Sequence, residues 1–396
     1  DENTVVTHET NIKDFISTPA SGRRSQFRSL GCAVSPTNAD HRNYMDSAWD
    51  KLKGHQEQRD LFSRSLANRR LSHAYVLAGQ DGIGKSRFGR LLAQSLFCRN
   101  SPPESLDACG ECRACRSFDA GSWPDYIEVG LPPGKNEIPI AAIAGSAEKR
   151  GREGLCFELS MTPQASERRI AIINDAHRMN AEGANALLKT LEEPPAQALI
   201  LLISDSPDSL LPTIRSRCQV VRFFPLSTED TIQILLNEEM TDSEQEAGTV
   251  AEVCNGSITS AQQLLNPELR ELRNTLERGL IKLEKLNPIE TSREITNAIE
   301  KMSSGTDEQR QNTQWMLRFL GDLLNQQLRK LTQGDLADPL HKRFGVRSGA
   351  DLVADLLDRV LTASFQIDAN SPVKLVLETL FDDLARMMRI GPTSAR

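Results

Sequence analysis

The first half of the chain alternates between short apolar runs and longer stretches with helical spacing. The runs have strand length and are apolar throughout, which is typical of strands buried on both faces. They predict strands at 74–78 (AYVLA), 169–175 (RIAIIND), 198–204 (ALILLIS) and 219–223 (QVVRF). Between them, helices are predicted at 85–97 and 184–195, the second closed by two prolines that cannot continue its hydrogen bonds. This alternation predicts an α/β fold with helices covering a parallel sheet, at residues 45–225.

The pattern differs on either side of this α/β region. Residues 1–44 are rich in Ser, Thr, Arg, Asn and Pro without a sustained apolar period, so we expect a flexible extension. Beyond residue 225 the periodicity is helical, and we expect a small helical domain at 226–267 and a larger helical bundle at 268–396. Just before the first strand, one helical face is predicted to carry Leu61, Phe62, Leu66 and Leu71.

Composition narrows the class of protein. With 396 residues, 39% hydrophobic and 26% charged, the chain resembles a globular protein of two or three domains. No apolar run approaches the roughly 20 residues of a membrane span, and the N-terminus has no apolar signal-type segment, so we expect no membrane association and a cytoplasmic location. The net charge is −7 with scattered Lys and Arg, which argues against strong, autonomous DNA binding.

The first chemical motif follows the first predicted strand. Residues 79–86, GQDGIGKS, fit the phosphate-binding loop (P-loop) pattern G-x-x-x-x-G-K-[ST]. Its backbone would turn at the glycines and cradle phosphates beside a helix start, with Lys85 on the β- and γ-phosphates and Ser86 on Mg²⁺. We expect ATP and Mg²⁺ to bind, the alternative being a glycine turn that holds no ligand. The expected binding residues are Gly79, Gly82, Ile83, Gly84, Lys85 and Ser86.

A second element of a nucleotide site is an acidic residue at the end of an apolar strand. Asp175 ends the run RIAIIND and would hold Mg²⁺ through water. Hydrolysis also needs a group that orients and deprotonates the attacking water, and the next residue is Ala176. The sequence therefore favours nucleotide binding over hydrolysis.

Four cysteines form the pattern C-x10-C-x2-C-x2-C within residues 98–115. Closely paired thiolates in a chain without a secretory signal suit tetrahedral Zn²⁺ better than disulfides, and four ligands with no open position make a structural site. The alternative is a set of reduced or redox-active thiols. The predicted zinc ligands are Cys98, Cys109, Cys112 and Cys115.

The stretch LLPTIRSRC places Arg215 and Arg217 between a proline-marked helix start and the strand at 219–223. By spacing alone, such an arginine is usually a surface charge. The functional alternative is an arginine finger that reaches the γ-phosphate bound to a neighbouring subunit.

Together these motifs resemble the clamp-loader branch of the AAA+ ATPases, which serves bacterial DNA polymerase III. The resemblance rests on GHQEQRDLFSRSL, LSHAYVLAGQDGIGKS, the four-cysteine insertion, NALLKTLEEPP and LLPTIRSRC, and covers about 45–390. It implies a RecA-like nucleotide domain, a helical lid (226–267) and a helical collar (268–396) that joins a five-subunit ring of gamma or tau and delta-type subunits. Such a ring loads a sliding clamp onto primed DNA, as part of the polymerase holoenzyme. The resemblance also assigns the arginine finger in trans to Arg217.

The chain departs from the hydrolysing gamma and tau subunits of that family at two positions. Those subunits carry Asp-Glu where this chain has Asp175 and Ala176, and a lid arginine where it has Thr259 in GSIT. We therefore expect a non-hydrolysing subunit that binds ATP, with a gamma/tau-type motor as the alternative. A small-molecule kinase is a third possibility, but it needs a substrate domain, and the second half of the chain is predicted to be a helical bundle.

Overall fold

The fold is taken from a computed structural model, which describes residues 49, 52–132, 135–281, 287–303, 305–333 and 339–390. The predicted extension at 1–44 lies outside these residues. The described residues all fall within one compact unit, Asp46–Arg396. Within the described part of the chain, no helix is both long and apolar enough to cross a membrane.

The core of the first half is a five-stranded sheet in which every pairing is parallel. Its spatial order is β2-β3-β4-β1-β5. β1 lies between β4 and β5 and pairs with β4 from Ala74 opposite Ile200 to Ala78 opposite Ser204. The strands are β1 (Ala74–Ala78), β2 (Tyr126–Val129), β3 (Arg169–Ile173), β4 (Ala198–Ser204) and β5 (Gln219–Arg222).

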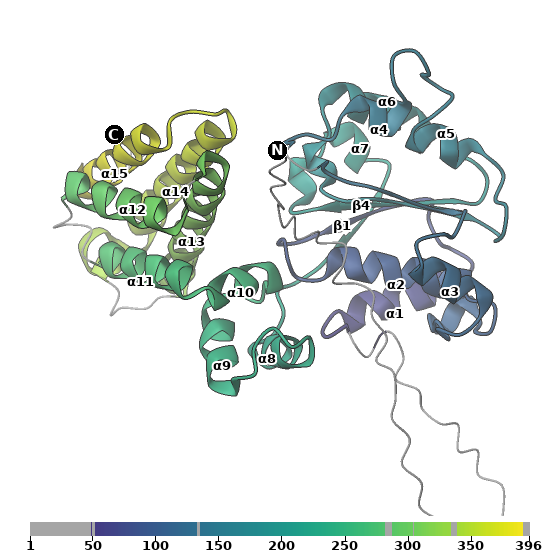
Figure 1. The fold of residues 1–396 in the computed structure, drawn as a ribbon, viewed down its shortest axis with the longest axis horizontal. Coiled ribbons are helices and arrows are strands. Elements are labelled where there is room, and N and C mark those ends of the chain that lie inside the picture. Colours follow the sequence, from purple (N-terminus) through teal and green to yellow (C-terminus); the bar gives the residue numbers. More distant parts are fainter. Residues whose placement is uncertain are drawn as a thin grey trace, which may run out of the picture. The chain divides into compact units, whose positions relative to one another are not determined.

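Helices cover both faces of this sheet, as Figure 1 shows. One face packs on α1 (Gln56–Ala67), α2 (Lys85–Phe97) and α3 (Arg113–Asp119), and alternate strand residues such as Tyr75 and Leu77 point into that layer. The other face, which includes Val76, packs on α4 (Ile140–Ala144), α5 (Leu155–Ser160), α6 (Ala181–Glu192) and α7 (Pro212–Arg215). Burial on both faces explains the unbroken apolar runs, because each successive side chain enters one core or the other. The first half thus has the expected α/β fold, with helices on both faces of a parallel sheet.

Two details of the first half differ from the sequence pattern. Leu61 is exposed and Leu71 lies beyond the end of α1, so only Phe62 and Leu66 of the predicted apolar face are buried on that helix. Adjacent residues such as Leu61 and Phe62 cannot share one helical face, since each residue turns the helix by about 100°. β2 was not predicted, because this edge strand mixes Tyr126 and Glu128 with Ile127 and lacks a continuous apolar run.

The second half is helical throughout its described residues. The predicted lid contains α8 (Thr228–Asn237), α9 (Glu244–Val253) and α10 (Ile258–Leu265); the predicted collar contains α11 (Pro267–Ile281), α12 (Pro288–Met302), α13 (Thr306–Thr332), α14 (Pro339–Asp368) and α15 (Val373–Ile390). One apolar core runs through both segments and includes Leu264 of α10 and Leu269 of α11. The boundary at 267/268 stays a prediction.

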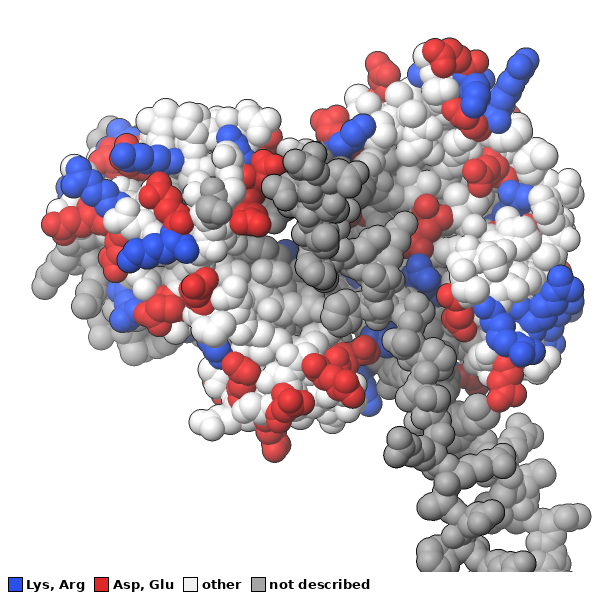
Figure 2. All heavy atoms as spheres, viewed as in Figure 1, with Lys and Arg blue, Asp and Glu red and all other residues white. Residues whose placement is uncertain are grey.

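Acidic and basic side chains are interspersed over the face of the molecule drawn in Figure 2. On that face, the distribution agrees with the scattered Lys and Arg of the sequence. Several opposite charges form ion pairs between distant segments, as in Arg90 with Glu128 and Arg87 with Glu238.

The carboxyl ends of the parallel strands meet at one edge of the sheet, where ligands bind in folds of this class. The P-loop follows β1, Asp175 follows β3 and Asp205 follows β4. Because β1, β4 and β3 are neighbours in the sheet, three segments far apart in the sequence deliver their polar groups to the same edge.

Candidate nucleotide and metal sites

The P-loop connects β1 to the long helix α2. Gly82 and Gly84 have φ angles of 77° and 97°, a region that favours glycine because it is strained for other residues. α2 begins at Lys85, so the positive end of its dipole lies at the loop. The Ile83 side chain is fully buried in the core and anchors the loop instead of facing a ligand. Its backbone oxygen lies 2.6 Å from His55 Nε2.

Lys85 is held inside its own loop. Its Nζ donates hydrogen bonds of 2.6 Å to the backbone oxygens of both Gly79 and Gln80, and the residue is only 4% exposed. Burial lowers the pKa of the ammonium, and the negative charges of Asp205, Asp81 and Asp175 oppose that shift. A phosphate bound by Lys85 would therefore replace the hydrogen bonds that Lys85 donates to the P-loop backbone. Ser86 follows in the first turn of α2.

The carboxylates of Asp81, Asp175 and Asp205 lie close enough to the Lys85 ammonium to affect its pKa. The sequence pattern predicted only Asp175. Asp175 lies between β3 and the short 3-10 helix η4 (Ala176–Arg178) with φ 51°. Burial raises the pKa of Asp175, with the charges of Asp81 and Asp205 adding to the effect. Asp205 follows β4 just as Asp175 follows β3, so the same signal, an acid after an apolar run, would have found it. Asp81 lies in the P-loop and had no such signal.

Ala176 is 1% exposed and packs into the sheet core. Its methyl group is therefore part of the apolar layer beside Asp175 and carries no acid or base. The position that would have supplied a second carboxylate to an attacking water is apolar in this chain, as the sequence indicated.

The lid lies directly against the P-loop. Ile258 N–H donates to the Gly82 oxygen at 2.8 Å. A Cβ at Gly82 would come within 2.4 Å of Ser257 Oγ and 2.6 Å of Thr259 Oγ1, so only glycine fits there. Thr259 thus occupies a place beside the loop, but it brings a hydroxyl and no charge.

A collar residue also contacts the P-loop. Arg318 of α13 donates from Nη1 to Asp81 Oδ2 at 3.1 Å. Sequence reasoning missed Arg318 because it lies more than 230 residues from the loop, inside a helix with no motif of its own.

An open cavity of about 490 Å³ is lined by the segments 52–59 and 224–227. It is joined to the P-loop by His55, which lines the cavity and bonds Ile83. Burial lowers the pKa of His55 despite the raising effects of the Ile83 hydrogen bond and of Asp230. His55 is therefore favoured in its neutral form in this wall, which also includes Trp49, Leu52 and Leu226.

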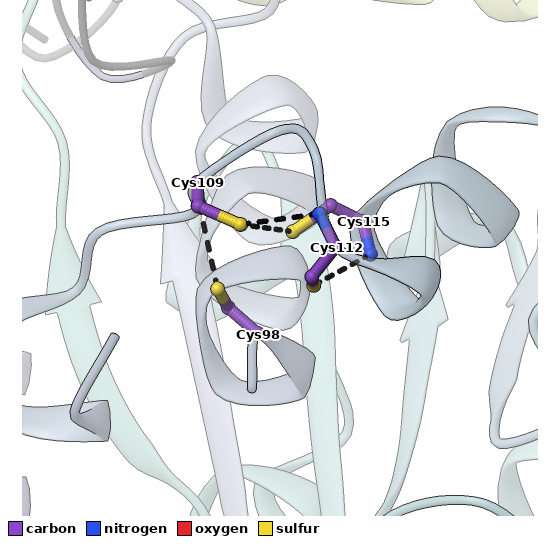
Figure 3. A group of neighbouring side chains, drawn as sticks. All are labelled: Cys98, Cys109, Cys112 and Cys115. Carbon is purple, nitrogen blue, oxygen red and sulfur yellow. Dashed lines mark hydrogen bonds between the residues drawn. The ribbon is translucent and has the colours of Figure 1, made fainter. Parts of the chain in front are cut away.

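The four predicted zinc ligands come together in space. Cys98 directly follows α2, Cys109 lies in the following loop, Cys112 caps the N-terminus of α3 and Cys115 lies in its first turn. Figure 3 shows the side chains converging, and their sulfur atoms all lie within 4.8 Å of one another. Tetrahedral zinc with sulfur at about 2.3 Å requires sulfur atoms about 3.8 Å apart, close to the 4.0 Å between Cys109 and Cys115. The cluster can hold a metal ion.

Backbone N–H groups support this cluster. Cys112 N–H donates to Cys109 Sγ at 3.3 Å and Cys115 N–H donates to Cys112 Sγ at 3.4 Å. Burial favours the neutral thiol at Cys112, but hydrogen bonds from Arg99 and Cys115 outweigh it and lower the pKa of Cys112 to about 6. Turns of this kind stabilise thiolates, the form that binds metal.

The other cysteines of the chain do not belong to this cluster. Burial raises the pKa of Cys218 to about 12 and also raises the pKa values of Cys156 and Cys254, as expected for packing residues. Cys32 lies outside the described residues.

Arg217 follows α7, and its side chain is 35% exposed. Its Nη2 lies 2.7 Å from Glu192 Oε1 at the end of α6, and its Nη1 donates to the Thr213 oxygen at 2.9 Å. These contacts fix a planar, always charged group at the surface. The neighbouring Arg215 pairs with Asp208 instead. The LEE and SRC motifs, separate in the sequence, are thus joined by an ion pair.

Comparison with known proteins finds relatives of the first half of the chain. Residues 54–227 match the family model described as "DNA polymerase III, delta subunit". The chain is 36% identical over 227 residues to the DNA polymerase III subunit delta' of Pseudomonas aeruginosa, covering 57% of this chain and 66% of the relative. It is 26% identical over 230 residues to subunit tau of Bacillus subtilis, covering 57% and 38% respectively. The match thus spans somewhat less than two thirds of the delta' relative.

Among solved structures, a gamma subunit-related protein of Thermotoga maritima is similar at 18% identity and a TM-score of 0.39, covering 83% of this chain and 99% of that one. The family match covers the sheet, the P-loop, the cysteine cluster and Arg217. The identity is higher to delta', at 36%, than to tau, at 26%. Over residues 54–227 the chain is therefore similar to the delta' subunits of DNA polymerase III.

Proposed function

We propose that this chain acts in a clamp-loader ring with gamma or tau and delta subunits, and helps to load the sliding clamp onto primed DNA in the bacterial cytoplasm. Its own contribution is Arg217, which completes the ATP site of a neighbouring subunit in trans. The observation that carries this proposal is the surface position of Arg217, within the segment that matches the family model. The contacts to Glu192 and Thr213 hold the guanidinium without burying it, so a phosphate on a partner can reach it.

The P-loop supports a second part of the proposal, which is that the chain binds ATP with Mg²⁺ but does not hydrolyse it by itself. Lys85 and Ser86 supply the phosphate and Mg²⁺ contacts, and Asp175 holds Mg²⁺ through water. The cavity beside His55 accommodates the base and sugar. The buried methyl of Ala176 provides no base for water, so ATP would remain uncleaved.

Zn²⁺ is the metal we propose for the cysteine cluster. Four thiolates at tetrahedral spacing leave no open position for a substrate, so the ion would be structural. It would tie the end of α2, which begins at the P-loop, to α3.

The trans role is tested by ATPase and clamp-loading assays on the ring reconstituted with this chain. Arg217→Ala should remove the contribution of the finger, about 10³-fold or more in turnover, at the one site that it completes. Arg217→Lys should recover little, because lysine lacks the planar fork. Arg215→Ala is the matched control, since Arg215 pairs with Asp208 on its own segment. Unchanged ATPase and loading with Arg217→Ala would contradict the proposal.

The alternative is a gamma/tau-type motor, which the intact Lys85 and Ser86 and the similarity to tau favour. It predicts robust ATP hydrolysis by the purified chain that is lost with Lys85→Ala. Our proposal predicts nucleotide binding that depends on Lys85 and no hydrolysis above background by the isolated chain.

A further inference from the structure

One helix of the collar contacts both the P-loop and the lid. On α13, Arg318, Asp322 and Gln326 are spaced four residues apart and so lie on one face. Arg318 binds Asp81 of the P-loop through Oδ2 at 3.1 Å, and its Nη2 lies 3.5 Å from the backbone oxygen of the same residue. Gln326 donates to Asn255 Oδ1 at 3.0 Å, and Asp322 also hydrogen-bonds Asn255. One row of polar side chains on α13 thus contacts both the P-loop and the turn of the lid at Asn255.

Asn255 begins the turn that brings the lid onto the P-loop. Asn255 and Gly256 have φ angles of 53° and 68°, which reverse the chain after α9. Two residues later, Ile258 N–H binds the Gly82 oxygen. The row on α13 therefore supports the P-loop directly at Asp81 and indirectly at Gly82.

The backbone oxygens of the P-loop are consequently paired with protein donors one after another. Lys85 takes those of Gly79 and Gln80, Arg318 lies next to that of Asp81, and Ile258 takes that of Gly82. Two of these donors, Lys85 and Arg318, are cations. They are close enough for the charge of Arg318 to contribute to lowering the pKa of Lys85.

Arg318 is well placed to exchange partners. Its side chain is 28% exposed and that of Asp81 is 49% exposed, so their ion pair is solvent-accessible and weak. The guanidinium stacks over Trp315 with its carbon 5.1 Å from the ring centre, which keeps it extended towards the loop. A guanidinium binds two phosphate oxygens at once, and a phosphate chain carries more negative charge than one carboxylate.

We propose that Arg318 is a phosphate-binding residue of the nucleotide site, supplied by the collar of the same chain. Asp81 holds it until a nucleoside triphosphate enters, whereupon Arg318 moves from the carboxylate to phosphate oxygens. Beside the P-loop the lid contributes the uncharged Thr259, so Arg318 supplies the cation there. The movement of Arg318 couples nucleotide binding to α13, and α13 in turn contacts the lid at Asn255 through Gln326. This inference rests on the proposed ATP binding and adds how that site is completed and regulated.

The experiment measures binding of a fluorescent ATP analogue with Mg²⁺ to the full chain. Arg318→Ala should weaken binding about tenfold, the value of one charge-assisted hydrogen-bonded contact. Asp81→Asn should tighten binding severalfold, because it frees Arg318 and removes a negative charge near the phosphates. In the double variant most of that tightening should disappear. Arg318→Lys should restore part of the affinity, and Lys330→Ala, an exposed cation on the same helix, should change nothing.

The double variant gives the decisive result, because removing the charge of Asp81 favours phosphate binding whether or not Arg318 takes part. If the pair were only a strut between collar and P-loop, Asp81→Asn would tighten binding at least as much in the Arg318→Ala background as in the wild-type chain, and the inference would be wrong. Unchanged affinity with Arg318→Ala would overturn it as well, and should that variant fail to fold, Arg318→Lys and Asp81→Asn decide alone. If the wild-type chain bound no ATP, both this inference and the proposed ATP binding would be wrong. The Arg217 assay in the ring would still test the trans role on its own.

Discussion

The buried carboxylate of Asp125 should control the stability of β3, the strand that precedes Asp175. Asp125 is fully buried just before β2 and accepts hydrogen bonds from the backbone N–H groups of Gln164, Ala165 and Ser166 at 2.7 to 2.8 Å. It also faces the guanidinium of Arg169, at 3.7 Å, in a pair that is 6% and 0% exposed. Arg169 is the first residue of β3, which ends just before Asp175.

Asp125→Ala should therefore be costly. It leaves three N–H groups without their acceptor and a buried arginine without its counter-charge, a change that costs about 3 to 5 kcal/mol in comparable buried pairs. This corresponds to a factor of about 10² to 5 × 10³ in the local opening equilibrium. Hydrogen-deuterium exchange of peptides spanning 160–170 measures it directly, because the three amides are those that lose protection. Glu167→Ala, an exposed acid in the same loop, is the matched control.

The pH dependence has a definite sign. Burial alone would raise the pKa of Asp125, but its hydrogen bonds from Gln164, Ser166 and Ala165 together hold it below 3.8, the ordinary value. A lowered pKa means that folding favours the ionised form, so the stabilisation is complete above about pH 4 and is lost as the pH falls through the lowered pKa. Asp125→Asn should thus be destabilising at pH 7 and nearly neutral at the acid end. A loss of protection below threefold with Asp125→Ala at pH 7 would refute the reasoning.

Two further predictions concern the sites themselves. Burial raises the pKa of Asp175, so its ionised form opposes folding at neutral pH but not below its ordinary pKa. Asp175→Asn should therefore raise the Tm at pH 7 by about 1 to 3 °C, and this gain should shrink as the pH falls. Equal gains in Tm at pH 7 and pH 4 would contradict this. Native protein should contain about one zinc per chain by metal analysis. Chelation, or Cys109→Ser, should remove it and expose the 98–115 segment to protease, and unchanged proteolysis would show that the ion does not hold this segment.

The sequence was sufficient where the signal is local. The strands at 74–78 and 198–204 were predicted to the residue, since a strand buried on both faces must be apolar throughout. The P-loop and the cysteine pattern were equally clear, because phosphate cradles and zinc ligands need fixed spacings between near neighbours. The edge strand β2 escaped prediction because its exposed positions break the apolar run.

What only the tertiary structure decided is which distant residues gather around the P-loop. The sheet order places Asp205 beside Asp175, the lid turn closes on Gly82, and Arg318 reaches Asp81 from a helix in the collar. None of these contacts has a sequence signature that identifies its partner, because each depends on packing between segments and not on spacing within one. The chain therefore encoded its phosphate loop locally, while the charges that surround that loop were fixed by the way the sheet, lid and collar pack together.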